Sequence, residues 1–254
     1  MMKSKSFPYF IRTIVRWNHF DASHLAKCHA NYSQLTPMTF FNRTVSLFPA
    51  QPAYEYNDNI VTWGLMKSRI SRFAHALVKF GIKHGDVVSI MAPNGPAVFE
   101  SHFAVPSIGA VLLAINTRLD ATTIAYQLAH SEAKIVFVDC EYSNIMREAV
   151  SILQKSTSKI PVFININDSC TPYGISQAPL IGETEYEDFL RSGDAGFELL
   201  PVRDEWDAIS LNYTSGTTGN PKGVVCTHRG AYLNSISNIV EWNMERFPRF
   251  LWSK

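Results

Sequence analysis

One short segment of the sequence combines residue types that bind phosphate groups. Residues 213–223 read Tyr-Thr-Ser-Gly-Thr-Thr-Gly-Asn-Pro-Lys-Gly, and the residues that could contact an anion there are Thr214, Ser215, Gly216, Thr217, Thr218, Gly219 and Lys222. The hydroxyl groups donate hydrogen bonds, and the glycines allow backbone turns that direct several N–H groups toward one anion. No acidic residue occurs between Asp207 and Glu241, so no nearby carboxylate repels a phosphate. We therefore predict a loop that binds a polyphosphate.

This loop differs from the two best-known nucleotide-binding loops. A Walker A loop has the pattern G-x-x-x-x-G-K-[ST], whereas here Pro221 stands five residues after Gly216 and Gly223 follows the lysine. No G-x-G-x-x-G of the Rossmann type occurs either. These differences disfavour an unrelated kinase-like protein. A solvated, hydroxyl-rich hairpin loop is the simpler alternative, and the length of the combined pattern argues against it.

The elements around the loop are predicted from hydrophobic periodicity and capping residues. Strands are expected at 208–213 and 224–226 on either side of the loop, with a helix at 229–245 after it. Upstream, the expected helices are 37–48, 63–79, 96–108, 121–130, 141–155 and 185–190. Thr36 and Thr62 are expected to cap the first two, and Gly81 to end the second. The expected strands are 53–56, 60–63, 87–91, 111–115, 134–138 and 160–166. Because strands alternate with helices, we predict an α/β fold with mostly parallel sheets flanked by helices.

Other polar residues near these elements have simpler interpretations. Arg118 and Asp120 are expected to form a turn between a strand and a helix, with Asp120 as the helix cap. His228 either meets a ligand or begins the last helix. The runs at 173–176 and 192–194 are interpreted as turns.

Composition excludes several classes of protein. Of the 254 residues, 46% are hydrophobic and 18% are charged, which is typical of a globular chain, and the net charge of +1 does not indicate a nucleic-acid partner. No run approaches the roughly 18 apolar residues of a transmembrane helix. The four cysteines are widely spaced and lack a C-x-x-C pair, so we expect free thiols and no protein-bound zinc.

Residues 1–20 are basic and contain no acid. On a helix, Arg12, Arg16 and His19 share one face, and the aromatic and aliphatic residues gather on the other. This composition is typical of a mitochondrial presequence, so we expect a targeting leader and mitochondrial import. The alternatives are a disordered leader with a chance basic bias, and a cytoplasmic or peroxisomal protein.

The loop resembles the signature phosphate loop of the adenylate-forming superfamily, the AMP-binding acyl-CoA synthetases and ligases. The similarity extends to residues 103–110, 116–120 and 227–232, which resemble the branch that holds medium-chain fatty acid and benzoate–CoA ligases. It runs from about residue 36 to the end, so 36–254 is expected to be a partial N-terminal AMP-binding domain.

The resemblance implies ATP-dependent activation of a fatty or aromatic acid in two steps. The carboxylate attacks the α-phosphorus of ATP, which gives an acyl adenylate and pyrophosphate, and coenzyme A then displaces AMP to form a thioester. In that account the loop hydroxyls hold the β- and γ-phosphates, Gly216 and Gly219 permit close approach, Lys222 is the catalytic cation, and Mg²⁺ bridges the phosphates.

The resemblance also has a limit. Family members are about twice this long, and a later adenine-contacting segment, a ribose-binding T-G-D motif and a small domain with a catalytic lysine are all expected after Lys222. Only 32 residues follow it (254 − 222). The chain is therefore either an N-terminal portion of an acid–CoA ligase or a catalytically incompetent product that at most binds nucleotide phosphates or a partner. The sequence specifies neither the acid nor an oligomeric state.

Overall fold

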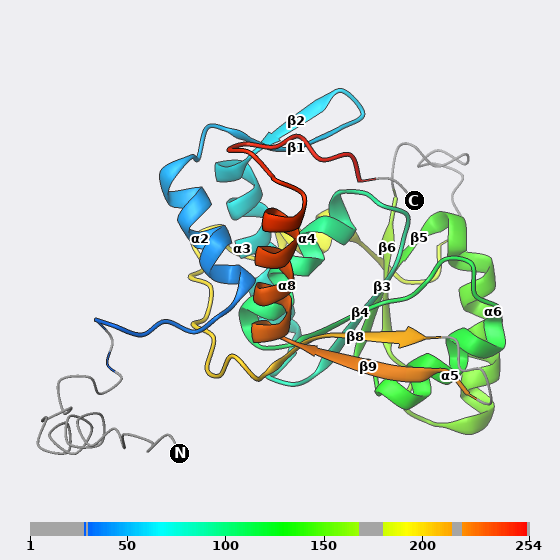
Figure 1. Ribbon diagram of the computed structural model, residues 1–254. Coiled ribbons are helices and arrows are strands. Elements are labelled where there is room, and N and C mark those ends of the chain that lie inside the picture. Colours follow the sequence, from blue (N-terminus) through cyan, green and yellow to red (C-terminus); the bar gives the residue numbers. More distant parts are fainter. Residues whose placement is uncertain (1–27, 29, 168–179, 215–219, 253–254) are drawn as a thin grey trace, which may run out of the picture. The chain divides into compact units, whose positions relative to one another are not determined.

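The computed structural model describes residues 28, 30–167, 180–214 and 220–252 (Figure 1). The chain divides into two units, residues 1–33 and 34–254. In the first unit, the described part forms a turn in which the backbone N–H of Cys28 donates a hydrogen bond to Oδ1 of Asn31 at 2.8 Å. The predicted leader, residues 1–20, lies outside the described residues.

The second unit is built on a seven-stranded sheet with the order β7-β6-β5-β3-β4-β8-β9. Its strands are β3 (Val87–Met91), β4 (Val111–Ala114), β5 (Ile135–Asp139), β6 (Val162–Ile166), β7 (Thr184–Glu185), β8 (Ala208–Thr214) and β9 (Lys222–Thr227). All neighbouring pairs are parallel except β8 and β9, which are antiparallel. The mostly parallel sheet predicted from the sequence is therefore confirmed.

Helices cover both faces of this sheet (Figure 1). One face packs against α2 (Pro37–Leu47), α3 (Trp63–Phe80), α4 (Pro96–Ala104) and α7 (Tyr186–Arg191), and the other against α5 (Ala121–Ser131) and α6 (Ser143–Ser156). The central strand β5 shows the reason: Ile135 and Phe137 join the first core, whereas Val136 and Val138 join the second. Since successive strand residues point to opposite faces, an all-apolar strand must be covered on both sides.

Side-chain caps begin three of the helices at the predicted residues. Thr36, Thr62 and Asp120 accept hydrogen bonds from the backbone N–H groups of Met38, Leu65 and Thr123, at 3.2, 3.3 and 2.9 Å. These bonds satisfy backbone donors that have no partner inside the helix. The helix α3 ends at Gly81, as predicted, in a left-handed conformation with φ of 102°.

The structure also contains a separate two-stranded hairpin, and several helices begin or end at residues other than those predicted. β1 (Pro52–Tyr56) and β2 (Asn59–Thr62) pair through a turn in which Asn57 and Asp58 have positive φ. The helix predicted at 96–108 is wrong in extent, because α4 ends at Ala104 and a separate 3₁₀ turn, η3 (Pro106–Ile108), follows. A second 3₁₀ turn, η4 (Cys140–Tyr142), precedes α6, and the last helix, α8 (His228–Glu241), ends before the predicted 245.

Apolar side chains of β9, of α8 and of the segment after α8 are exposed. β9 is an edge strand, and its Val225 is 59% exposed. Val240 of α8 and Leu251 are 71% and 85% exposed.

Candidate functional site

The β8–β9 hairpin holds the described ends of the predicted phosphate loop. In its register Thr214 lies opposite Lys222 and Tyr213 lies opposite Gly223. Residues directly opposite each other in an antiparallel pair project from the same face. Thr214 and Lys222 therefore project together from one face, and both are exposed at the open end of the hairpin.

Five of the predicted site residues, Ser215, Gly216, Thr217, Thr218 and Gly219, lie outside the described residues. The structure therefore places the first and the last residue of the predicted set, Thr214 and Lys222, and brings them together as a cross-strand pair. The sequence predicted a strand only from 224. β9 begins at Lys222, which puts the lysine on a strand with a defined direction.

The hairpin opens at the carboxyl edge of the parallel strands. β8 runs parallel to β4, with Leu112 opposite Ser210, so the chain leaves both strands at the same edge. Ligands of open α/β sheets bind at this edge. The segment after β4 turns there through a hydrogen bond from the Arg118 backbone N–H to Oδ1 of Asn116, at 2.9 Å. Together with the Asp120 cap, this bond confirms the turn predicted between strand and helix.

A pair of residues that the sequence analysis missed lies on the opposite face of β8. The Tyr213 hydroxyl and Nδ1 of His130, on α5, are 2.7 Å apart. The His130 ring stacks on Tyr126, one turn earlier in the helix, with 5.5 Å between the ring centres. The spacing of Tyr126 and His130 by four residues was a signal that they share a helix face, but nothing local pointed to Tyr213.

His228 begins α8 and lies apart from the open end of the hairpin, so the second of its two predicted interpretations is confirmed. Its Nδ1 lies 2.8 Å from Oγ1 of Thr36, and its backbone N–H donates to the carbonyl oxygen of Asp207 at 3.1 Å. The side chain is almost completely buried. Burial lowers the pKa of His228, and the nearby Asp207 charge opposes this effect while His84 adds to it.

The run at 192–194 is a turn, as predicted. Ser192 follows α7, the carbonyl oxygen of Gly193 accepts a hydrogen bond from Nη1 of Arg72 at 3.0 Å, and Oδ1 of Asp194 accepts one from the Gly196 backbone at 3.0 Å. A Cβ at Gly193 would lie 1.9 Å from the Arg72 carbonyl oxygen, so only glycine fits this approach. The other run, at 173–176, lies outside the described residues.

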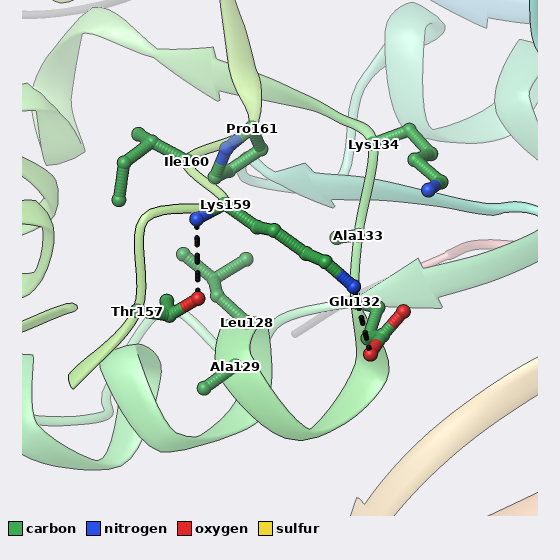
Figure 2. A pocket seen from close by; sticks show the side chains of 9 residues that line it. All are labelled: Leu128, Ala129, Glu132, Ala133, Lys134, Thr157, Lys159, Ile160 and Pro161. Atoms are coloured by element: carbon green, nitrogen blue, oxygen red, sulfur yellow. Dashed lines mark hydrogen bonds and ion pairs between the residues drawn. The ribbon is translucent and has the colours of Figure 1, made fainter. Parts of the chain in front are cut away.

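Two hollows lie at the amino ends of the parallel strands, away from the hairpin opening. Figure 2 shows the first, a cavity of about 220 Å³ between the end of α5 and the segment before β6. Lys159 crosses it to reach Glu132, with 3.5 Å between Nζ and Oε1 (Figure 2). The second, of about 520 Å³, shares Lys134 with the first. The exposed Lys159 and Glu132 form an ion pair with each other. Because this pair leaves neither charge for a ligand, we place no part of the candidate site in these hollows.

The part of the chain that the structure describes contains no group of three histidine, cysteine, aspartate or glutamate residues arranged to hold a metal ion. Cys28, Cys140 and Cys226 take part in no disulfide, and Cys170 lies outside the described residues. None of the described helices is both long enough and apolar enough to cross a membrane.

A match to a known protein family shows to which family the chain belongs. The sequence profile described as AMP-binding enzyme matches residues 41–253, which include the whole seven-stranded sheet and the hairpin. The chain belongs to the AMP-binding enzyme family. The resemblance inferred from the loop is thereby confirmed.

Individual AMP-binding enzymes are similar over most of this chain. An acetate–CoA ligase of Humulus lupulus is 44% identical over 237 residues, which cover 92% of this chain and 42% of that protein. A benzoate–CoA ligase of Arabidopsis thaliana, named peroxisomal, is 42% identical over 236 residues, covering 90% of this chain and 40% of that protein. The crystal structure of an anthranilate CoA ligase in complex with anthranoyl-AMP has the same fold, with a TM-score of 0.67 and 20% sequence identity. The match covers 80% of this chain and 37% of the anthranilate CoA ligase chain. The chain thus spans about two fifths of the length of the curated relatives it matches.

Proposed function

We propose that this chain carries the phosphate-binding part of an ATP-dependent acid–CoA ligase. In the first step a carboxylate oxygen bonds to the α-phosphorus of ATP, and the bond between the α-phosphorus and the bridging oxygen breaks to release pyrophosphate. In the second step the sulfur of coenzyme A bonds to the acyl carbon, and AMP leaves with the carboxyl oxygen. The products are an acyl-CoA thioester, AMP and pyrophosphate.

The observation that supports this proposal most directly is the pairing of Thr214 with Lys222 at the carboxyl edge of the sheet. A hydroxyl donor and a cation that project from one face of a hairpin can contact neighbouring oxygens of one polyphosphate. Charge develops on the departing pyrophosphate during adenylation, so donors fixed before the reaction stabilise its transition state more than they stabilise bound ATP.

We propose that the loop completes this binding surface. Ser215, Thr217 and Thr218 contribute hydroxyl groups to the phosphates, and Gly216 and Gly219 allow the backbone to approach them. The hairpin segments 208–214 and 220–227 contain no carboxylate. If Mg²⁺ accompanies ATP, it would neutralise phosphate charge there, and the hairpin would contribute hydroxyl groups and Lys222 rather than carboxylate ligands.

The proposed acid is a short aliphatic or a small aromatic carboxylate. Relatives named for acetate and for benzoate match this chain at 44% and 42% identity, so residues 41–253 are compatible with both classes. We assign the choice of acid to residues outside the phosphate-binding hairpin, because Thr214 and Lys222 contact groups that all these substrates share.

Nucleotide binding by the 254-residue chain tests the proposal. Isothermal titration with Mg·ATP is expected to show saturable binding that Lys222→Ala weakens about tenfold, since one charge-assisted hydrogen bond in a partly solvated site is lost. Lys159→Ala is the matched control, because that lysine lies in the cavity at the other edge of the sheet. Equal affinities for the Lys222→Ala and wild-type chains would contradict the assigned role of Lys222.

We also propose that this chain by itself binds ATP without catalysing the reaction. The supporting observation is that the chain spans about two fifths of the length of each relative. For these 254 residues alone, we expect no pyrophosphate release from ATP with acetate or benzoate. Steady release in that assay would refute binding without turnover and assign the adenylation step to this chain.

We also propose a peroxisomal location. The name of the Arabidopsis benzoate–CoA ligase includes that compartment, whereas the names of the relatives considered give no support to the mitochondrial import expected from residues 1–20. A fluorescent fusion of the chain, examined with and without residues 1–20, distinguishes the two compartments. Fluorescence in mitochondria that depends on residues 1–20 would overturn the peroxisomal proposal.

A further inference from the structure

Three aromatic side chains connect α5 to the hairpin. The Tyr213 ring meets the rings of Tyr126 and His130 edge-on, with centre-to-centre distances of 6.4 and 5.7 Å. Its hydroxyl lies 2.7 Å from Nδ1 of His130, although the two residues are 83 positions apart in the sequence. Partial burial raises the pKa of Tyr213, and the neighbouring Tyr126 adds to the effect, so the phenol keeps its proton and can donate it to Nδ1.

The Tyr213 ring also covers the start of β9. Gly223 lies directly opposite Tyr213 in the register. A Cβ built on Gly223 would come within 2.9 Å of Cδ1 of Leu211 and 3.5 Å of Cε1 of Tyr213. The absence of a side chain at Gly223 therefore lets these two side chains rest on the backbone next to Lys222.

Few other contacts restrain this end of β9. It is an edge strand of the sheet, so β8 is its one strand neighbour among the described residues. Lys222, Val224 and Val225 are all exposed. The direction in which Lys222 projects depends strongly on its pairing with β8 and on the ring that lies over Gly223.

We propose that His130 is a positioning residue for the phosphate-binding hairpin. By holding the Tyr213 hydroxyl, it keeps the ring over Gly223 and thereby keeps Lys222 opposite Thr214. A half-exposed phenol without this bond would turn toward water, and the backbone at Gly223 would lose its cover. The effect on nucleotide binding rests on the proposed function, whereas the effect on β9 does not.

Two measurements on the full chain test this role. Backbone hydrogen exchange reports the pairing of residues 222–227, and titration with Mg·ATP reports binding. We expect His130→Ala and Tyr213→Phe each to speed exchange in 222–227 and to weaken ATP binding by about fivefold, the effect of one net hydrogen bond. Because both changes remove the same bond, the double variant is expected to show little further loss.

Two other variants separate the hydrogen bond from the packing of the rings. His130→Asn places an amide near the position of Nδ1 and is expected to restore both readouts to within about twofold of wild type. Tyr126→Phe removes a phenol from the same cluster without touching the 2.7 Å contact, and is expected to change neither readout. A structural role of the ring alone would leave the asparagine variant as impaired as the alanine variant.

The outcomes distinguish this inference from the proposed function. If the wild-type chain binds no ATP, the proposed function fails, and hydrogen exchange still decides the role of His130. If ATP binds and His130→Ala changes neither exchange nor affinity, the proposed function stands and the positioning role is overturned. Impairment of the asparagine variant to the level of the alanine variant also overturns it.

Discussion

Glu100 on α4 is the residue whose replacement gives the sharpest stability prediction. Its carboxylate is completely buried. One oxygen, Oε1, accepts hydrogen bonds from Nε of Arg69 at 2.5 Å and from the Tyr54 hydroxyl at 3.1 Å. The other, Oε2, accepts them from Nη2 of Arg69 at 3.2 Å and from the Tyr186 hydroxyl at 2.6 Å. Each carboxylate oxygen therefore faces one N–H group of the same guanidinium.

This geometry makes Glu100→Gln severely destabilising despite its nearly equal volume. Whichever way the amide is turned, its NH₂ group faces an N–H of Arg69, so two donors oppose each other in a buried site. The change also removes the negative charge that balances Arg69, and breaking a buried ion pair costs about 3–5 kcal/mol. We expect a loss of this size in the free energy of unfolding.

Urea unfolding followed by circular dichroism measures the effect. With a denaturant dependence of roughly 3 kcal/mol per molar urea, the expected loss lowers the midpoint by about 1–1.7 M. Glu187→Gln is the matched control: Glu187 contacts the same guanidinium, but its side chain is 42% exposed. The control is expected to cost about 1 kcal/mol or less, because water screens and replaces that pair. Equal costs for the two variants would refute the argument that burial decides the strength of this network.

Two further predictions concern pH and association. Because burial lowers the pKa of His228 below its unfolded value of about 6.5, the unfolded state takes up the proton first, so stability is expected to fall as the pH drops below about 6.5. His228→Asn is expected to reduce that slope in urea midpoints measured between pH 7.5 and 5.5, and an unchanged slope would assign the effect to other groups. The exposed apolar side chains of β9 and α8 are expected to cause concentration-dependent self-association, which gel filtration detects. Val225→Lys is expected to reduce it, whereas Val162→Lys, on β6, is not; equal behaviour of the two variants would exclude β9 as the contact.

Local signals were sufficient for most of the elements. Thr36, Thr62 and Asp120 were predicted as helix caps, and each bonds a backbone N–H two or three residues ahead. Such bonds depend on a few neighbouring residues, so the sequence contains all the information they need. The helix predicted across Pro106 shows the limit of the same reasoning, because periodicity continued through a position where the helix breaks and restarts.

The candidate site was recognised from residue types but not in its geometry. The combination of hydroxyls, glycines and a lysine predicts a phosphate-binding loop, and this role stays a prediction. That Lys222 lies opposite Thr214 on a strand, rather than free in a loop, follows from the register of β8 with β9. Register depends on the packing of both strands against the sheet.

From the sequence alone come the α/β class, several helix starts and the prediction that residues 213–223 bind an anion, since each rests on neighbours along the chain. Only the tertiary structure decided the strand order, the burial of Glu100 between Arg69 and two tyrosines, and the contact of His130 with Tyr213. Those contacts join residues from 31 to 86 positions apart. Their partners are chosen when helices pack on the sheet and polar groups lose water, because a buried donor or acceptor must then be satisfied by whichever group the fold brings within reach.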